Sequence, residues 1–248
     1  MKIATYNISG GFYIGDESTE YLDRAPAENF DNNMLSEVID AINQKNIDII
    51  CFQEIITTKE VKYIETIVEN TNLKNFDCFE LHNCNLVKDT RNGLAILSKY
   101  PITKTVRGFF PNPLITKTTS SGKTYNLYNK GYMISEIDVN GKKLQILNHH
   151  GFPFRRFNSA ANLNQEVFNH FNDIIKTFKP DYIVGDFNTE DYTELAEELK
   201  NNYSKTVNSV STVDGKSFDE VLVKNGVKTE VETMKLLSDH FLEIVKIY

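Results

Sequence analysis

The sequence predicts an α/β protein in which two β-sheets pack face to face and helices cover them. Three observations lead to this prediction. Many short strand-like segments are interspersed with only three or four helical ones, strands and helices alternate early and midway, and the late part is strand-rich. This mixture favours a helix-covered two-sheet sandwich over a purely parallel, doubly wound sheet. With 248 residues and no linker, repeat or low-complexity tract, we expect one domain over residues 1–248.

Strands and helices are expected to alternate in the first part of the chain. Apolar residues between Met34 and Ile42 fall on one helical face, and the nearly all-apolar segment 47–52 predicts a central strand. Val61, Ile64 and Val68 share a face of a second helix. The elements expected up to residue 109 are strands over 2–8, 47–52, 76–81, 93–98 and 102–109, a polar loop over 10–29, and helices near 34–42 and over 59–70.

Strands dominate the second part of the chain. The stretch 111–131 is rich in Pro, Thr, Ser, Gly and Asn, which predicts a long functional or mobile loop. Asn140-Gly141 is a strong hairpin signal, and an apolar stripe from Val167 to Phe178 predicts a core-facing helix. The elements expected here are strands over 132–139, 143–149, 181–185, 205–210, 217–224, 227–234 and 241–247, and helices over 159–178 and 192–200.

Charge is distributed unevenly along the chain. The net charge of −7 argues against a protein that coats nucleic acid non-specifically. Residues 99–156 nevertheless hold ten Lys and Arg side chains and two acids, a charge of +8, which leaves −15 for the rest. This basic segment predicts either a local anion-binding face or solvated lysines on strand edges and loops. Its aromatic residues Tyr125, Tyr128, Phe152 and Phe154 either stack on a substrate or pack in the core.

The sequence carries no export or membrane signal. No apolar run approaches the roughly 18 residues of a membrane-spanning helix, and the N-terminus alternates like a strand instead of resembling a signal peptide. The three cysteines, at 51, 78 and 84, do not indicate a disulfide framework, and their spacing around His82 does not match a structural zinc site. We therefore expect a cytoplasmic protein.

Polar residues collect where the expected strands end. They come from six segments: Asn7; Gln53 and Glu54; Asn148, His149 and His150; Asp186 and Asn188; Asp219; and Ser238, Asp239 and His240. Open sheets place their ligands at strand ends, so these segments are expected to converge. Asp186 and Asn188 are expected to point the same way, because residues two apart on an extended chain share a face. Gly185 is expected to let the backbone turn without crowding the site.

The side-chain types at these ends predict a metal-dependent reaction on a phosphate ester. Glu54, Asp186 and Asp239 are hard oxygen ligands and Asn7 and Asn188 add amide oxygens, a set that suits Mg²⁺ or Mn²⁺ better than zinc. No Cys or Ser–His spacing indicates a covalent nucleophile, and no Gly-rich phosphate or dinucleotide loop is present. Metal-assisted attack of water is the chemistry that this set supports.

Seven short motifs, taken in order, resemble the endonuclease/exonuclease/phosphatase superfamily. They are TYN (5–7), FQE (52–54), NGLAILSKYPI (92–102), LNHH (147–150), GDFN (185–188), FDEVLV (218–223) and SDH (238–240). Each motif is weak by itself, but the ordered set covers nearly the whole chain. The resemblance implies a DNase I-like, four-layer αββα sandwich and a Mg²⁺-dependent phosphohydrolase, with Mn²⁺ as a possible substitute.

The resemblance also implies which residues handle the metal and the water. Glu54 is implied as a metal ligand, Asn7 lies beside that metal, and Asp239 supports the metal or the water. Asp186 is implied as the residue that orients or deprotonates the attacking water. Asn188 is implied to hold both the phosphate and Asp186.

Further roles implied by the resemblance concern the histidines. His240 is implied to contact the scissile phosphate, where a charged imidazole would offset growing negative charge. Asp219 resembles the carboxylate that fixes the orientation of His240. The family's N-x-H pattern maps onto Asn148-His149-His150, which makes His150 a phosphate contact and leaves His149 a weaker candidate. The substrate-binding residues expected from this segment and the next are Asn148, His149 and Arg155.

Departures from the family's patterns narrow the substrate. Ser9 stands two residues after Asn7, where abasic-site nucleases carry an acid, and the Trp-containing motifs of those nucleases and of inositol phosphatases are missing, since the chain has no Trp. Abasic repair is therefore not expected.

The basic segment makes a nuclease acting on DNA or RNA the first expectation. A phosphatase or phosphodiesterase of a small molecule or lipid headgroup is the alternative. A narrow pocket closed by loops 10–29 and 111–131 would favour the alternative, and an open basic groove would favour the nuclease. A non-catalytic binding module would need a broken motif, and none is broken. No obligate protein partner is evident, so a monomer is expected.

Overall fold

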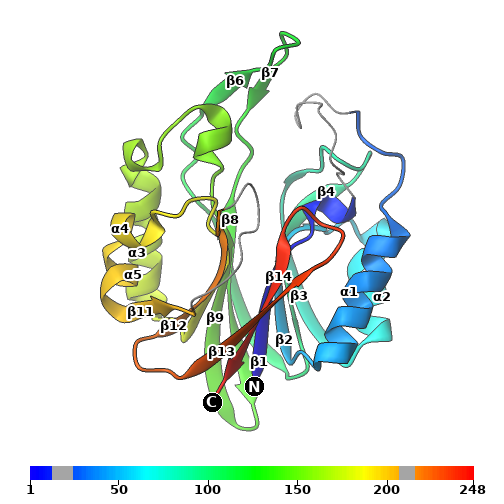
Figure 1. Cartoon of the computed structure of the whole chain (residues 1–248), viewed down its shortest axis with the longest axis vertical. Coiled ribbons are helices and arrows are strands. Elements are labelled where there is room, and N and C mark those ends of the chain that lie inside the picture. Colours follow the sequence, from blue (N-terminus) through cyan, green and yellow to red (C-terminus); the bar gives the residue numbers. More distant parts are fainter. Residues whose placement is uncertain (13–24, 207–215) are drawn as a thin grey trace.

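Two six-stranded β-sheets pack face to face in a computed structural model of the chain, which describes residues 1–12, 25–206 and 216–248. The first sheet, in spatial order, contains β13 (Thr229–Lys235), β14 (Phe241–Ile247), β1 (Lys2–Asn7), β2 (Ile49–Ile56), β4 (Arg91–Ser98) and β3 (Asn75–Asn83). The second contains β11 (Tyr203–Lys205), β12 (Asp219–Lys224), β10 (Tyr182–Asp186), β9 (Lys142–His150), β8 (Gly131–Val139) and β5 (Ile102–Phe109). A separate hairpin, β6 (Thr116–Thr118) and β7 (Thr124–Asn126), projects beyond one end of the sandwich in Figure 1.

Helices cover the outer face of each sheet, as Figure 1 shows. The first sheet is covered by α1 (Asn32–Lys45) and α2 (Tyr63–Asn70), and the second by α3 (Gln165–Phe178), α4 (Tyr192–Leu195) and α5 (Glu197–Asn202). Local signals fix the ends of α1, because the Asp31 carboxylate accepts a hydrogen bond from the Asn33 N–H at 2.8 Å and Asn46 ends the helix in a left-handed conformation. The short 3₁₀ segments are η1 (Ser9–Gly11), η3 (Lys59–Val61), η4 (Phe154–Phe157) and η5 (Ala161–Leu163).

Three buried apolar clusters hold these layers together. One lies between α1, α2 and the first sheet, and a second, rich in phenylalanine, lies between α3, α4, α5 and the second sheet. The third lies between the sheets and contains Ile3, Ile96, Val184 and Val245, which face inward because alternate residues of a strand share a face. The expected four-layer αββα sandwich is therefore confirmed.

Several expected boundaries differ from the observed ones. The helix expected over 59–70 begins as η3 and restarts as α2 after Lys62, whose left-handed conformation (φ 54°) interrupts it, so that Tyr63, Ile64 and Ile67 form the buried face. The helix expected over 159–178 is α-helical only from Gln165. The helix expected over 192–200 divides at Ala196, which is extended.

Other expectations concern loops and short strands. The loop expected over 111–131 contains β6 and β7, which pair antiparallel, with Lys117 opposite Tyr125, across a turn at Gly122. The strand expected over 205–210 overlaps β11 only at Lys205, and residues 207–210 lie outside the described part of the chain. Much of the loop expected over 10–29 also lies outside it. Among the described residues, no helix combines the length and apolar character needed to cross a membrane.

Candidate active site

The polar residues at the strand ends meet at one edge of the sandwich. In the first sheet β1 and β2 run parallel, and Asn7 lies opposite Gln53. In the second sheet β9 and β10 run parallel, and Asp186 lies between His150 on one side and Asp219 on the other. Because parallel strands end at the same edge, the two sheets bring their terminal polar side chains to a shared cleft.

Asp186 is the carboxylate that ends β10. Its side chain is buried and accepts hydrogen bonds from the Asn7 amide at 2.9 Å and from the backbone N–H of Asn188 at 2.8 Å. The bond from Asn7 links the two sheets directly. Burial and the neighbouring Asp219 carboxylate raise the pKa of Asp186 to about 7, although His240 and Asn7 act in the opposite direction. Asp186 can therefore gain and lose a proton near neutral pH.

The chain is not extended through Asn188, contrary to expectation. The strand ends at Asp186, and Asn188 adopts a left-handed conformation (φ 54°) with its amide donating to the Gly151 carbonyl at 3.2 Å. Asn188 therefore orients Asp186 through its backbone N–H. Glycine is required at position 185 for a different reason from the expected one. Its φ is +152°, and a Cβ there would lie 2.0 Å from the His149 carbonyl oxygen. The backbone of β9, and not the site, requires this glycine.

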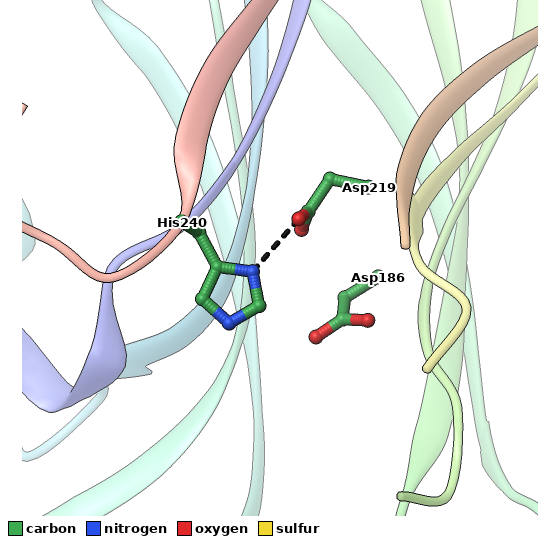
Figure 2. Close-up of side chains that lie close together, drawn as sticks. All are labelled: Asp186, Asp219 and His240. Carbon is green, nitrogen blue, oxygen red and sulfur yellow. Dashed lines mark hydrogen bonds and ion pairs between the residues drawn. The ribbon is translucent and has the colours of Figure 1, made fainter. Parts of the chain in front are cut away.

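His240 and Asp219 form a buried pair across the sheets, drawn in Figure 2. The Nδ1 of His240 lies 2.7 Å from Oδ2 of Asp219, which is fully buried. Burial opposes a charged ring, but the Asp219 and Asp239 carboxylates outweigh it and raise the pKa of His240 to about 10. The ring is therefore charged at neutral pH, with Nδ1 bound to Asp219 and Nε2 directed to the cleft beside Asp186.

Asp239 lies at the entrance of the site. Its carboxylate accepts a hydrogen bond from the Ser9 hydroxyl, lies 3.9 Å from His240 Nε2 and lies 3.9 Å from the Arg156 guanidinium. Although burial opposes ionisation, His240, Ser9 and Arg156 lower the pKa of Asp239. Ser9, which stands where abasic-site nucleases carry an acid, thus supports this carboxylate instead of adding another negative charge.

Glu54 reaches the cleft from a bulge in β2. The register with β4 shifts between Gln53 and Ile55, and Glu54 itself has a φ of +53°. This irregularity turns a carboxylate toward the site from a strand whose neighbouring side chains are buried in the core. The Glu54 side chain keeps 17% of its surface exposed.

A buried lysine contacts both Glu54 and His150. The Lys130 ammonium lies 2.9 Å from His150 Nε2, 3.1 Å from Nδ1 and 3.6 Å from Glu54 Oε1. His150 Nε2 lies 3.6 Å from Glu54 and 3.5 Å from Asp186. Burial and the Lys130 charge hold the pKa of His150 well below its usual range, so its ring is neutral. Burial also lowers the pKa of Lys130, against the pull of Glu54 and Asp186.

Asn148 and His149 lie away from this cluster. The Asn148 amide donates to the carbonyls of Phe52 and Ala95 at 3.1 and 3.0 Å and accepts from Gln53 at 2.8 Å, so it ties the sheets together inside the core. His149 points to the other side of β9, where it packs against aromatic side chains and its Nε2 has no hydrogen-bond partner in the described structure. Burial lowers the pKa of His149 to about 3.

Arg155 lies at the mouth of the site, on η4, and its side chain is exposed. A pocket at this mouth is lined by Pro153, Arg155, Arg156, Asn188, Phe218 and His240. Of the eleven expected residues, nine therefore have side chains at the cleft or its mouth, and Asn148 and His149 are used elsewhere.

The donors at the centre of the site fit a divalent cation. Ligand atoms of Asp186, Asp219 and His240 lie within 4.8 Å of one another, but the charged His240 ring offers no lone pair, so the two carboxylates are the donors of this group, and the buried Oδ1 of Asp219 has no hydrogen-bond partner in the described structure. Burial, followed by the Asp219 charge, raises the pKa of Asp186, and a nearby metal ion would favour the ionised form of this carboxylate. The expected ligands Asn7, Glu54 and Asp239 flank this group, and their ligand role stays a prediction.

Sequence reasoning did not single out Lys130, Ser9 or Arg156 as members of the site. Lys130 was only one charge of the basic segment, but it directly precedes Gly131, which pairs with His150 in the β8–β9 ladder. The predicted hairpin at Asn140-Gly141 therefore contained the signal, because counting back along its two strands places residue 131 opposite residue 150, and Lys130 is the next residue.

Comparisons with known proteins agree with this architecture. The model of the Endonuclease/Exonuclease/phosphatase family matches residues 4–240. A comparison with curated proteins gives no match. Among solved structures, an endonuclease/exonuclease/phosphatase family protein from Leptotrichia buccalis is 16% identical, with a TM-score of 0.67 and coverage of 100% of this chain and 99% of that one.

Two further solved structures carry names that describe an activity. A mannosyl-6-phosphatase from Bacteroides thetaiotaomicron is 12% identical, with a TM-score of 0.60 and coverage of 100% of this chain and 99% of that chain. A sphingomyelinase C from Streptomyces griseocarneus is 14% identical, with a TM-score of 0.60 and coverage of 98% of both chains. At these identities the likeness concerns the fold.

Proposed function

The chain belongs to the endonuclease/exonuclease/phosphatase family, a family of phosphoester-hydrolysing enzymes, and on that premise we propose that it hydrolyses a phosphate ester with the help of a divalent cation, Mg²⁺ or Mn²⁺. The observation that supports this proposal best is that one cleft contains both a charged histidine, His240, and a carboxylate with a pKa near neutral pH, Asp186. Such a pair supplies a base and an electrostatic stabiliser for the same reaction.

Glu54 and Asp239, with Asn7 beside them, would hold the cation, and it would supply positive charge that polarises the phosphate and lowers the pKa of water. These three residues enter from β1, β2 and the segment before β14, so the first sheet provides them all. The fit is chemical: carboxylate and amide oxygens are the donors that Mg²⁺ prefers.

Asp186 would accept the proton of the attacking water. Its pKa of about 7 matches a base that works near neutral pH, and hydrogen bonds from Asn7 and from the Asn188 backbone fix its direction. The second sheet thus provides the base, opposite the expected metal ligands.

His240 would stabilise the charge that develops on the phosphate. Asp219 holds its Nδ1 at 2.7 Å, which leaves the protonated Nε2 to donate to a phosphoryl oxygen. Lys130 and Arg156 add positive charge on other sides of the cleft, so a dianionic phosphate would meet three cations.

The substrate that this geometry favours is a small phosphate ester. The basic segment 99–156, which made a nuclease the first expectation, does not form one continuous face. Lys142 and Lys143 lie at the turn between β8 and β9, at the opposite end of β9 from His150, ~26 Å away by the rise of an extended strand. Arg107 is paired with Asp77 on β3.

Two observations bear on the remaining choice. The mannosyl-6-phosphatase and the sphingomyelinase C that share the fold are named for substrates that are not polymers. A nucleic-acid strand is the second candidate, supported by Lys130, Arg155 and Arg156, which do lie at the site. The expected monomeric state and cytoplasmic location stay predictions.

A panel of phosphate esters tests the proposal. The protein is stripped of metal with EDTA, then assayed with and without Mg²⁺ or Mn²⁺ on p-nitrophenyl phosphate, bis-p-nitrophenyl phosphate, sugar phosphates, phospholipids, and single- and double-stranded DNA and RNA. We expect metal-dependent hydrolysis of a small ester. Cleavage of nucleic acid alone would select the second candidate, and no metal-dependent hydrolysis of any substrate would refute the proposal.

A further inference from the structure

A second groove continues from the mouth of the site. It shares Arg155, Asn188 and Phe218 with the pocket that contains His240, and it extends between η4, η5 and the segment around α4. Its volume of about 560 Å³ lies in the range of small-molecule sites. A group attached to a phosphate beside His240 would therefore enter this groove.

The groove is polar but has almost no uncompensated charge. Two basic and three acidic side chains line it. Glu190 pairs with Lys216 at 3.0 Å, and Glu194 pairs with Lys200 at 2.8 Å. Arg155 and Asp191 add one charge of each sign to the lining, so the groove carries no large net charge that would attract a strong anion or a strong cation.

Asp191 is placed to accept hydrogen bonds from a ligand. It occupies the residue before α4, where an aspartate normally caps the helix, but its carboxylate makes no capping bond. Its side chain is exposed on the groove. Ser159, Asn162 and Thr189 add neutral hydrogen-bonding groups, and Phe218 gives an apolar surface beside Asn188.

This lining disfavours two of the substrate classes that the fold could serve. A nucleic-acid strand running along the groove would find no excess of positive charge for its next phosphate, because the lining holds three carboxylates against two basic side chains. A quaternary ammonium headgroup would find two of those carboxylates already paired with lysines. An uncharged group with several hydroxyls meets neither penalty and can use the neutral donors and acceptors.

We propose that this groove binds the uncharged, hydroxyl-bearing alcohol part of the substrate, so that the enzyme acts on monosaccharide or polyol phosphates. The inference rests on the proposed function. In the reaction, the water oxygen bonds to phosphorus, the bond from phosphorus to the sugar oxygen breaks, and that oxygen leaves with a proton. The products are the free alcohol and inorganic phosphate.

Substitution of Asp191 by leucine tests the groove without touching the reacting residues. Glucose-6-phosphate and p-nitrophenyl phosphate are compared, because both present a phosphate monoester but only the first has sugar hydroxyls. We expect Asp191→Leu to lower kcat/KM for glucose-6-phosphate at least about 10-fold more than for p-nitrophenyl phosphate, as expected for the loss of one hydrogen bond to a charged group. Asp173→Leu, on the exposed face of α3, is the matched control and should leave both values unchanged.

The outcomes separate this inference from the proposed function. If Asp191→Leu lowers kcat/KM equally for the two monoesters, or for neither, the groove assignment is overturned. Metal-dependent hydrolysis of these esters would still support the proposed function. Preferred hydrolysis of a DNA oligonucleotide or of phosphatidylcholine vesicles over sugar phosphates would also overturn it. Absence of metal-dependent hydrolysis of any ester would remove the proposed function and the inference together.

Discussion

Replacing Asp219 with asparagine should discharge His240 at a pH where the wild-type ring is still charged. Asp219 is fully buried, and its Oδ2 lies 2.7 Å from Nδ1 of His240. Asparagine keeps the shape and offers a carbonyl to the same nitrogen, but it removes the negative charge. Burial, which disfavours the charged ring, is then opposed mainly by Asp239, whose carboxylate lies 3.9 Å from Nε2 and is partly exposed.

The expected shift follows from the wild-type value. A pKa of about 10, against an ordinary 6.5, corresponds to about 5 kcal/mol in favour of the charged ring. Loss of a neighbouring opposite charge typically removes roughly 1–3 pKa units. Because the folded-state pKa is raised, this interaction stabilises the wild type fully below pH 6.5 and is lost as the pH rises through about 10. In Asp219→Asn the pKa of His240 should be lower, so this stabilisation should be lost at a pH roughly 1–3 units below that of the wild type.

Long-range ¹H–¹⁵N correlation NMR can follow the rings of all five histidines against pH. His240→Gln assigns the relevant signal. We expect wild-type His240 to stay charged beyond pH 9, and the upper limb of the kcat/KM profile to move to lower pH in Asp219→Asn by the same amount as the ring titration. Breaking a buried pair should also cost about 3–5 kcal/mol in unfolding free energy. A ring that titrates near 6.5 in the wild type, or one that stays equally charged in the variant, would refute the reasoning.

Three further predictions concern the metal and the core. Glu54→Gln should weaken Mg²⁺ binding by at least about 10-fold in calorimetric titration and abolish metal-dependent turnover, and unchanged activity would contradict its ligand role. Asn148→Leu should lower the free energy of urea unfolding by about 3 kcal/mol or more, because the buried carbonyls of Phe52 and Ala95 lose their donor. An unchanged unfolding free energy would show that these carbonyls find other partners. His149 has a pKa lowered to about 3, so protonation of the unfolded state should reduce stability as the pH falls below 6.5. Between pH 7 and pH 5, the free energy of urea unfolding should therefore fall by about 2 kcal/mol less in His149→Phe than in the wild type. Equal decreases in the two proteins would contradict the role of His149 protonation.

The layers and most strands follow from the sequence because their signals are local. Alternation predicts β8 and β9, and Asn140-Gly141 forms the expected turn with left-handed φ values of 54° and 89°. Helix boundaries were less predictable. Lys62 and Ala196 interrupt expected helices although neither residue type breaks helices by itself, so tertiary packing sets these interruptions.

The membership of the site is predictable where a motif ends a strand, and not where two segments meet only in space. Asp186, Asp219 and His240 come from motifs and converge because strand register places them at one edge. Asn148 and His149 sit in the same motif as His150, but the pleat of β9 and the packing of the opposite sheet decide that one binds core carbonyls and the other packs on phenylalanines. Lys130 enters through a pairing across two strands, which no short motif records.

The most direct test of the central claim compares metal-stripped wild type with Asp186→Asn in hydrolysis of the best phosphate ester from the panel, before and after addition of Mg²⁺. Circular dichroism verifies that both proteins are folded. We predict no hydrolysis until Mg²⁺ is added, and a kcat lower by roughly 10²-fold or more in Asp186→Asn, as expected for loss of a general base. Full activity of the wild type in EDTA, or equal rates for the two proteins with Mg²⁺, would contradict the claim.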